Sequence, residues 1–497
     1  MNLDRATCYR AMRTRDRRFD GRFFIAVRTT GIYCRPVCPA RPPKLENVTF
    51  YACAAAAETA GFRPCKRCRP ETAPGTPAWL GSSALVARGL RLIDAGALDD
   101  EEGGVEALAA RLGVGARQLR RLFEQHLGAS PVAVARAQRL ATARALIDQT
   151  ALPMWEIAAA AGFRSLRQFN HAVRTSFGAA PTALRRRVAR DARDAAGLTL
   201  RLPYRPPLDW RGLLAFLAAR ATPGVEQVAD GAYRRTVDAG DAPAWIEVRA
   251  VPAAAALALR IHGADAAAVP GLIERARRVF DLSADPLAIA AHLRRDLRLR
   301  RSLTAQPGLR VPGAWDPFEI AVRAVVGQQV TVRGATTLMG RLVERCGAPL
   351  AGIDGLTHRF PTPAALAAAD LTGIGMPSAR VAALQGLAAA VARGAVVLDA
   401  ARGLDEVVER LTALPGIGAW TAHYIAMRAL GEPDAFPHGD LGLRAALGNG
   451  SGPVSSAALA EAAEAWRPWR AYAAMHLWQT LGASDQKDTK APSGEQQ

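Results

Sequence analysis

The spacing of apolar positions gives the chain three textures. Residues 85–188 carry apolar side chains at helical intervals, and from Leu198 apolar and polar residues alternate in LTLRLPY, WIEVRAV and LALRIHG, which predicts strands. From Ala268 onward, short runs of Ala, Leu and Arg between glycines predict helices. The clearest helical stripe, with spacings of three, four and four, predicts a buried face formed by Leu166, Phe169, Val173 and Phe177.

Two segments of the helical texture share one plan. VEALAARLGVGARQLRRLFEQHLG (105–128) predicts a helix, a glycine turn and a second helix, and PMWEIAAAAGFRSLRQFNHAVRTSFG (153–178) repeats it. The run PVAVARAQRLATARALI between them predicts one long connecting helix. The polar side chains of the second unit suit contact with base edges in a DNA groove. These are Arg164, Ser165, Arg167, Gln168 and Asn170.

Changes in composition mark the joints between domains. PETAPGTPAWLGSS (70–83) is rich in Pro, Gly and Ser, and LRRRVARDARDAAG (184–197) is charged and ends in glycine, so both indicate linkers. The polar run ASDQKDTKAPSGEQQ predicts a disordered tail. We therefore expect four folded parts and a tail, at residues 1–75, 85–188, 198–266, 267–482 and 483–497.

Positive charge is concentrated in the first part of the chain. Residues 1–200 carry 32 Lys and Arg against 17 Asp and Glu, whereas the remaining residues carry 32 against 28. This distribution indicates a polyanionic partner, most simply double-stranded DNA. The alternative is that the arginines reflect only a GC-rich genome.

Hydropathy and cysteine usage limit the location. No apolar run approaches the roughly 18 residues that a membrane span needs, and the N-terminal residues have no apolar core typical of a secretory signal. Seven cysteines, an odd number, favour reduced thiols over a disulfide framework. We expect a bacterial cytoplasmic protein associated with the nucleoid.

Four cysteines near the N-terminus have the spacing of metal ligands. Cys34 and Cys38 form one pair, and Cys65 and Cys68 form a second pair 26 residues later. Two short loops of this kind can present four thiolates to one tetrahedral ion, and a four-sulfur set favours Zn²⁺. On spacing alone, a purely structural zinc site is the favoured interpretation.

The surrounding residues change that balance. VRTTGIYCRPVCPARPP, ENVTFYA and AGFRPCKRCRP resemble the N-terminal domain of the adaptive-response methylation regulator, Ada. In that family the first cysteine of the four accepts a methyl group from a DNA methylphosphotriester. The resemblance implies this nucleophilic role for Cys34 and ligand roles for all four cysteines.

The implied chemistry is consistent with the residue types. Zinc holds a bound thiol as the nucleophilic thiolate, and methylation of one sulfur changes the formal charge of a four-thiolate zinc site from −2 to −1. A less negative site binds DNA more tightly. Arg35, Lys66 and Arg67 flank the cysteines, as does Arg63, and suit contact with phosphates.

The paired helix-turn-helix units, especially IAAAAGFRSLRQFNHAVRTSFGAAPTALR, resemble the DNA-binding domain of AraC-type transcription activators. The resemblance implies promoter DNA and RNA polymerase as partners. The alternative is that the two helical hairpins form only a small bundle.

A third motif lies in the C-terminal part. LTALPGIGAWTAHYIAMRAL (411–430) places a turn containing Gly416 and Gly418 between two predicted helices, and such a turn can direct backbone N–H groups at a phosphate. Downstream, FPHGDLGLRAAL contains Asp440. On pattern alone, a helix-capping role for this carboxylate is as well supported as a catalytic one.

The order of these motifs resembles the helix-hairpin-helix DNA glycosylases, most closely 3-methyladenine DNA glycosylase II, over residues 198–482. WDPFEIAVRAVVGQQVTVRGATTL, LPGIGAWTAHY, FPHGDLGL and WRPWRAYAAMHLW carry the resemblance. It implies a catalytic role for Asp440, a base pocket that includes Trp420, Tyr424 and Trp478, and a wedge into DNA at Gln329. Core packing is the alternative for each aromatic side chain.

The same resemblance implies the reaction. A damaged nucleotide would be flipped out of the duplex, and Asp440 would stabilise the oxocarbenium-like sugar and help orient the attacking water. Bifunctional relatives carry a lyase lysine where this chain has Trp420, so we expect monofunctional hydrolysis. No Pro-Cys-His-Arg motif occurs, so we do not expect O6-methylguanine repair.

Together these features predict a multidomain protein, mainly α with α+β parts. Its expected components are a small zinc-bound α/β domain, a double helix-turn-helix, a β-rich subdomain and a helix-hairpin-helix glycosylase body. The expected function combines a methylphosphotriester sensor, a transcription activator and an alkylpurine DNA glycosylase. The alternative is a DNA-binding regulator with a structural zinc and an inactive glycosylase-like domain.

Overall fold

The computed structural model describes residues 4–74, 84–98, 104–185, 197–240, 242–448 and 452–488, with the backbone alone for 482–488. Most of the first predicted linker, most of the second, and tail residues 489–497 lie outside this range. No helix in it is long and apolar enough to cross a membrane.

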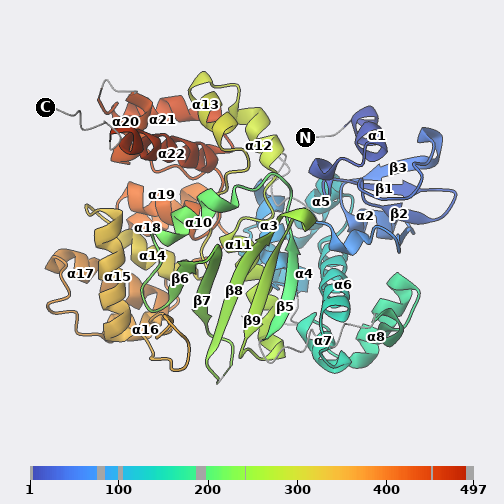
Figure 1. Cartoon of the computed structure of the whole chain (residues 1–497), viewed down its shortest axis with the longest axis horizontal. Helices are drawn as coiled ribbons and strands as arrows, with labels where there is room; N and C mark the ends of the chain where they lie inside the picture. The colour runs from blue at the N-terminus through green and yellow to red at the C-terminus, as the bar shows by residue number, and fades with distance from the viewer. Residues whose placement is uncertain are drawn as a thin grey trace, which may run out of the picture.

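The N-terminal domain is a four-stranded sheet with helices packed on it (Figure 1, blue). Its strands lie in the order β3-β1-β2-β4, and only the β2–β4 pair is parallel. The carboxylate of Asp4 accepts from Thr7 N at 2.8 Å and begins the first helix. The elements are α1 (Arg5–Arg13), β1 (Phe24–Val27), β2 (Ile32–Cys34), β3 (Val48–Tyr51), α2 (Ala54–Thr59) and β4 (Arg63–Pro64).

The second domain is helical and contains both predicted helix-turn-helix units. The long helix α6 connects them, and its N-cap Ser130 accepts from Ala133 N at 3.2 Å. Gly128 and Gly178 end α5 and α8 in the left-handed region, which glycine adopts without strain. The elements are α3 (Ala84–Asp94), α4 (Gly104–Arg111), α5 (Ala116–Leu127), α6 (Pro131–Gln149), α7 (Met154–Ala160), α8 (Leu166–Phe177) and α9 (Pro181–Leu184).

An antiparallel five-stranded sheet follows, in the order β5-β9-β8-β7-β6. The predicted β-rich subdomain is confirmed, and the three alternating runs are β5, β8 and β9. One face of the sheet shares a continuous apolar core with α6, α7 and α8 of the second domain. The elements are β5 (Leu198–Pro203), α10 (Trp210–Ala218), β6 (Glu226–Ala229), β7 (Ala232–Val237), β8 (Ala244–Val251) and β9 (Ala256–His262).

The remainder is helical, as predicted, and its helices bury two main cores. Tyr424 packs against both of them, so it lies where the two groups of helices meet. Helix α22 continues six residues beyond 482, into the segment expected to be a disordered tail. The helices are α11 (Val269–Val279), α12 (Pro286–Leu293), α13 (Leu297–Ala305), α14 (Pro317–Val326), α15 (Val332–Cys346), α16 (Pro363–Ala368), α17 (Ser378–Ala392), α18 (Leu404–Thr412), α19 (Ala419–Arg428), α20 (Leu441–Gly448), α21 (Ser456–Ala463) and α22 (Arg470–Asp488).

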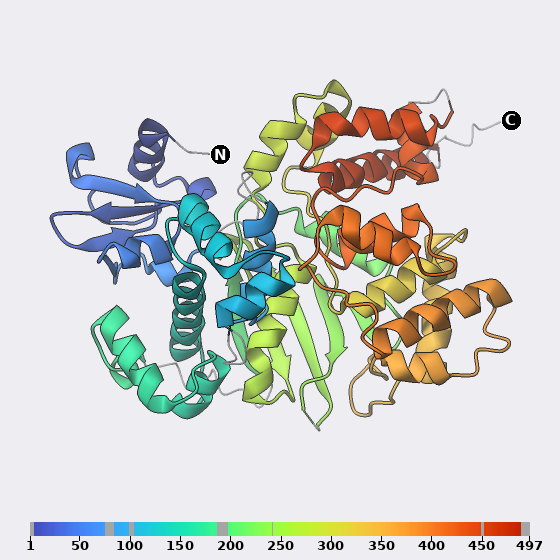
Figure 2. The ribbon, with the colours of Figure 1, turned by 180° about the vertical axis from the view of Figure 1, so that it is seen from behind.

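The domains also contact one another through polar side chains, and Figure 2 shows the N-terminal domain and the second domain lying against the sheet side of the C-terminal half. Arg22 Nε lies 2.7 Å from Asp285 Oδ2 in a largely buried ion pair between the first domain and α12. Arg205 donates to Pro74 O at 2.8 Å, and Arg69 pairs with Asp148. Such contacts fix the arrangement of the parts; the domain boundaries expected from the sequence stay predictions.

Candidate functional site

The parallel pairing of β2 with β4 brings the two cysteine pairs together. Cys34 ends β2 and Cys65 follows β4, and the register places Tyr33 opposite Pro64. The four Sγ atoms of the cluster all lie within 4.8 Å of one another. A tetrahedral zinc–thiolate site places its sulfurs about 3.8 Å apart, so small side-chain movements suffice to close this cluster around an ion.

The sulfurs perturb one another, which also fits a cation site. Hydrogen bonds that the Cys34 thiol donates to Cys38 and Cys68 raise the pKa of Cys34 above its ordinary value. The hydrogen bond between Cys38 and Cys34 lowers the pKa of Cys38 to about 2. Sulfurs this close share one negative charge unequally, and several thiolates coexist here only if a cation neutralises them.

The remaining cysteines lie outside the cluster. Burial raises the pKa of Cys8 and of Cys53 to about 11, and burial raises the pKa of Cys346 as well. All three therefore stay protonated at neutral pH. Buried and protonated, Cys8 and Cys53 are ordinary unreactive thiols.

The basic residues around the cluster fall into two groups. Arg35 donates from Nε to Asp20 Oδ1 at 2.8 Å and from Nη1 to Thr72 Oγ1 at 2.7 Å, and its backbone N donates to Cys68 Sγ at 3.3 Å. Its guanidinium is thus occupied within the domain, which favours a role in shaping the cysteine loop over the phosphate contact suggested by the sequence. Lys66 and Arg67 are exposed beside the cluster.

Four of the five predicted DNA-facing side chains of the second domain are exposed, and the fifth, Asn170, is half-buried. Arg164, Arg167 and Gln168 are exposed at the start of α8, where Ser165 Oγ caps the helix by accepting from Gln168 N at 3.1 Å. The prediction that Leu166 belongs to the buried stripe is wrong, because 44% of it is exposed. It is the first residue of α8, and its side chain has no preceding turn to pack on.

Asp440 lies at the meeting point of three N–H donors. Its Oδ2 accepts from Trp420 Nε1 at 3.0 Å. Its Oδ1 accepts from Trp478 Nε1 at 2.9 Å and from Leu443 N at 2.9 Å, the latter capping α20. A carboxylate has about four lone-pair sites, so one site remains, on Oδ2. The carboxylate is therefore a helix cap and is also held between the two tryptophans.

The predicted pocket aromatics are in contact with one another. Trp420 and Tyr424, one turn apart on α19, stack with ring centroids 5.4 Å apart and planes 18° apart. The ring of Tyr424 lies 6.5 Å from that of Trp478, tilted by 58°. All three side chains are partly exposed.

A group of arginines behind Tyr424 was not found from the sequence. Arg428 Nη1 donates to the Tyr424 hydroxyl at 3.0 Å. Burial alone would raise the pKa of Tyr424, but Arg428, Arg220 and Arg323 together hold it below its ordinary value. Only Arg428 gave a usable signal, since it lies four residues after Tyr424 on one helix face.

The hairpin turn before α19 requires glycine at its first glycine position. Gly416 has φ +78°, and a Cβ atom there would lie 2.5 Å from Ala383 Cβ, so only glycine fits. Gly418 begins α19 without a side-chain cap and is exposed. Gln328 Nε2 donates to Gly416 O at 2.9 Å and thereby holds the turn against the loop carrying Gln329. Gln329 is exposed and has φ +55°.

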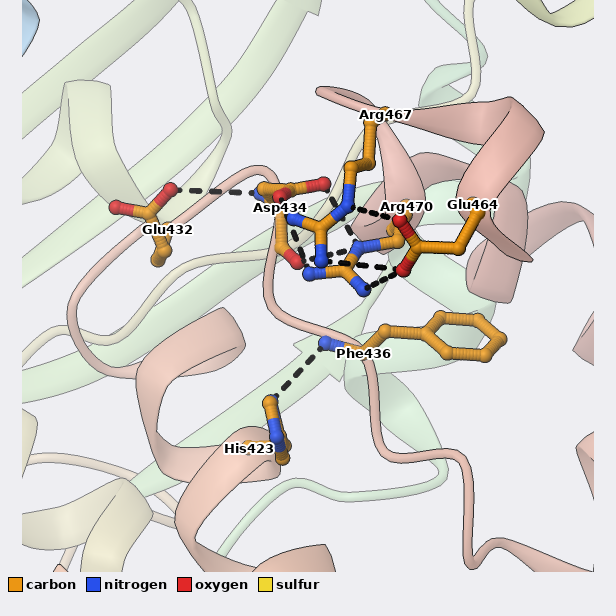
Figure 3. A network of polar contacts seen from close by, with 7 residues as sticks. All are labelled: His423, Glu432, Asp434, Phe436, Glu464, Arg467 and Arg470. Atoms are coloured by element: carbon orange, nitrogen blue, oxygen red, sulfur yellow. Dashed lines mark hydrogen bonds and ion pairs between the residues drawn. The ribbon is translucent and has the colours of Figure 1, made fainter. Parts of the chain in front are cut away.

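An ionic network fixes the loop that leads to Asp440, as Figure 3 shows. Asp434 pairs with Arg467 and with Arg470, whose Nε lies 2.8 Å from Asp434 Oδ1. Glu464 binds the same two arginines, at 2.7 Å from Arg467 Nε and 3.3 Å from Arg470 Nη1. Phe436 N donates to His423 Nδ1 at 3.4 Å. The loop is therefore anchored to both α19 and the start of α22.

Three families of domain match this chain. They are described as the metal-binding domain of Ada, over residues 7–71, a helix-turn-helix domain, over residues 108–187, and the AlkA N-terminal domain, over residues 199–316. These matches confirm the resemblances stated from the sequence. With the four-cysteine cluster, the first of them also confirms the prediction of one zinc ion.

Whole relatives agree with this division. A Mycobacterium tuberculosis protein described as a probable bifunctional transcriptional activator/DNA repair enzyme AlkA is 47% identical over 97% of both chains. DNA-3-methyladenine glycosylase 2 of Escherichia coli is 37% identical over 56% of this chain and 97% of its own length. The bifunctional transcriptional activator/DNA repair enzyme Ada of Escherichia coli is 40% identical over 28% of this chain and 38% of its own length.

Proposed function

Since the chain belongs to the family of bifunctional transcriptional activators and DNA repair enzymes represented by the Mycobacterium tuberculosis relative, we propose that it senses and repairs alkylated DNA at two separate sites. The observation that carries the repair half is Asp440, held by Trp420 and Trp478 beside the ring of Tyr424. We place this work on nucleoid DNA in the bacterial cytoplasm.

The C-terminal half excises alkylated purines such as 3-methyladenine by hydrolysis. The flipped base stacks among Trp420, Tyr424 and Trp478, and an electron-rich aromatic surface favours a base made cationic by alkylation. The bond between C1′ and the base nitrogen breaks, the electron pair leaves with the base, and the oxygen of a water bonds to C1′ while its proton passes to solvent. The free lone pair on Asp440 Oδ2 stabilises the developing sugar cation and orients that water.

The lysine content supports hydrolysis without a lyase step. After residue 200 the only lysines are Lys487 and Lys490, both at the end of the chain. Trp420 occupies the position where a lyase would need an amine to form a Schiff base. The product is therefore an intact abasic site.

The hairpin turn and the loop before α15 hold the duplex during excision. Gly416 and Gly418 present backbone N–H groups to a phosphate, and this contact positions the DNA without reading sequence. Gln329 enters the space left by the flipped nucleotide. Its left-handed backbone projects the side chain from a loop that Gln328 ties to the hairpin turn.

The N-terminal half reports damage. Cys34, Cys38, Cys65 and Cys68 hold the zinc, and a bound zinc keeps its sulfur ligands as nucleophilic thiolates. The Cys34 sulfur forms a bond to the methyl carbon of a methylphosphotriester. The bond from that carbon to the phosphotriester oxygen breaks, and a phosphodiester anion leaves. Exposed Lys66 and Arg67 contact the neighbouring phosphates.

The methylated protein then acts as a transcription activator. Loss of one negative charge at the cysteine cluster strengthens DNA binding, and Arg164, Arg167 and Gln168 at the start of α8 read base edges of the promoter. RNA polymerase is the protein partner in this step. Our proposed domain limits are 1–75 for the sensor, 85–188 for the activator, and 198–266 with 267–482 for the glycosylase.

Base release from methylated duplex DNA tests the excision half. The wild-type protein should release free methylated purine and leave abasic sites, whereas Asp440→Asn should lose roughly 100-fold or more of the rate. Equal release by both proteins would favour the regulator with an inactive glycosylase-like domain. For the sensor, mass spectrometry should find one added methyl group on Cys34 after exposure to DNA containing methylphosphotriesters, and label on another cysteine would reject the assignment.

A further inference from the structure

Helices α3 and α4 of the activator domain contact the helix-hairpin-helix at both of its ends. Before α18, Arg111 Nη2 lies 2.9 Å from Asp399 Oδ2, and Ala401 is buried in the apolar core of α3, α4 and α5. After α19, Arg91 of α3 donates to Gly431 O and to Glu432 Oε2, each at 3.4 Å. Two helices of the activator domain therefore bracket the hairpin that faces DNA.

The contact of Arg91 continues along the loop to the carboxylate. Glu432 Oε1 accepts from Asp434 N at 3.4 Å, and Asp434 is the residue held by Arg467 and Arg470 in Figure 3. Asp440 lies eight residues after Glu432. The pair of Arg91 and Glu432 is shielded from solvent, with 19% and 11% of the side chains exposed, so salt screens it less than a surface pair.

We infer that Arg91 is a positioning residue for excision, and that the activator domain holds the loop bearing Asp440 in its working geometry. This inference rests on the proposed excision activity. Arg91 lies in the activator domain and Glu432 in the glycosylase half, so this contact joins the two parts of the fused chain. Breaking the contact should affect the chemical step more than DNA binding, because Arg91 touches the loop and not the DNA-facing turn.

Single-turnover base release with saturating full-length protein tests this role. Arg91→Ala should lower the rate about tenfold, within the hundredfold cost of misplacing a reacting group by about 1 Å. The DNA affinity should stay near that of wild type, and Arg91→Lys should recover part of the rate. Arg111→Ala is the matched control, since it breaks an ion pair of the same interface away from the loop, and it should react at the wild-type rate.

Two outcomes would overturn the inference: a wild-type rate for Arg91→Ala, or equal slowing by Arg91→Ala and Arg111→Ala, which would indicate a generally loosened interface. Amide hydrogen exchange separates this result from failure of the proposed function. Arg91→Ala should speed exchange in residues 431–440 even if wild type releases no base, and unchanged exchange there would reject the positioning role.

Charge distribution carries a second, independent inference. Residues 201–497 have 32 basic and 28 acidic side chains, and the segment RRDLRLRR (294–301) alone contains five arginines and one aspartate. Without this segment, residues 201–497 would contain equal numbers of basic and acidic side chains. Its five arginines are all exposed, and Leu297 among them is 71% exposed.

The segment is built to display these charges. Asp296, its only acid, accepts from Arg298 Nε at 2.9 Å and from Trp466 Nε1 at 2.7 Å. Among the described residues no carboxylate forms an ion pair with the other four arginines. Ser302 Oγ and His476 Nδ1, 2.9 Å apart, join α13 to α22, the helix that also carries Trp478. Figure 1 shows α13 beside α21 and α22.

We propose that residues 294–301 form a second surface for the DNA backbone, outside the hairpin turn. Duplex DNA carries one negative charge per roughly 1.7 Å and so matches a dense row of arginines. The four arginines without ion pairs are the ones that would contact phosphates. They are Arg294, Arg295, Arg300 and Arg301.

The salt dependence of productive binding tests this surface. The protein concentration giving half-maximal single-turnover excision is measured from 50 to 200 mM salt, for wild type and for variants with all four arginines replaced by Gln or by Lys. The logarithmic slope should become shallower by about 0.9 per lost phosphate contact in the Gln variant, up to about 3.6, and should persist in the Lys variant. An unchanged slope in the Gln variant would overturn the proposal, and the maximal rate reports separately on excision.

Discussion

Replacing Asp440 by Asn tests how its three donors are satisfied. Asn keeps one oxygen, which can still accept from Trp478 Nε1 and Leu443 N. Its amide NH₂ then faces Trp420 Nε1, where the carboxylate accepted at 3.0 Å, so a donor meets a donor. A helix cap alone would tolerate the change, because Asn and Asp cap helices about equally well.

The expected loss of stability follows from that one broken contact. A hydrogen bond to a charged group contributes about 1.5 to 3 kcal/mol, and the group left without a partner is a partly exposed tryptophan N–H that water can reach. We therefore expect Asp440→Asn to destabilise the region around α19 and α20 by about 2 kcal/mol. Replacing Trp420 by Phe removes the opposing donor, so the same change in that background should cost at least about 1 kcal/mol less.

Native-state hydrogen exchange measures this cycle, because the chain has several domains and its global unfolding is not a single transition. Opening free energies are compared for amides of residues 419–448 in wild type, Asp440→Asn, Trp420→Phe and the double variant. The sum of the losses in opening free energy of the two single variants should exceed the loss in the double variant. Costs that add to within about 0.5 kcal/mol would refute the shared hydrogen bond between these side chains.

Four other predictions concern separate parts of the molecule. Gly416→Ala should destabilise the protein by about 1 to 3 kcal/mol and weaken DNA binding, because its Cβ would overlap Ala383, and melting curves with a binding titration check this. Asp20→Asn should lower the unfolding free energy of the sensor domain by about 3 kcal/mol, because it leaves the largely buried Arg35 guanidinium without its charge partner. Hydrogen exchange measures this loss. A zinc chelator should lower the melting temperature of that domain and release one zinc ion per chain, measured by atomic absorption. Burial lowers the pKa of His476 to about 4. The buried neutral imidazole therefore contributes its full stabilisation above the ordinary pKa near 6.5, and this stabilisation is lost as the pH falls to 4. Replacing the side chain in His476→Gln should flatten that part of a stability–pH curve by up to about 1.4 kcal/mol per pH unit.

The sequence could assign the elements but not every exposed face. The alternating runs of the β-rich subdomain and the paired helices of the activator domain occur as predicted, because each carries its period within one short segment. The prediction that Leu166 is buried is wrong because it too rested on spacing within one short segment. A helical period predicts which residues share a face, but at the first residue of α8 that face extends past the protein core.

The candidate site was limited by contacts between distant segments. The spacing of the four cysteines predicts a metal site, since zinc ligands commonly occur in short pairs. The two roles of Asp440 could not be separated, because Trp478 lies 38 residues away and only the folded chain brings it within hydrogen-bonding distance. Arg35 posed the same problem, since its charge suggests a phosphate contact until Asp20 is seen to bind it.

The two proposed sites differ in what remains after each reaction. The carbon–sulfur bond formed at Cys34 is a stable thioether, so one chain can report damage only once. Asp440 forms no lasting bond, because water takes the place of the base, so the same chain can excise repeatedly. The buried pair of Arg22 and Asp285 joins the sensor to α12 without involving Cys34 or Asp440. On the proposed chemistry, methylation of Cys34 would leave Asp440 and its two tryptophan donors unchanged, so a methylated chain is expected to keep excising bases.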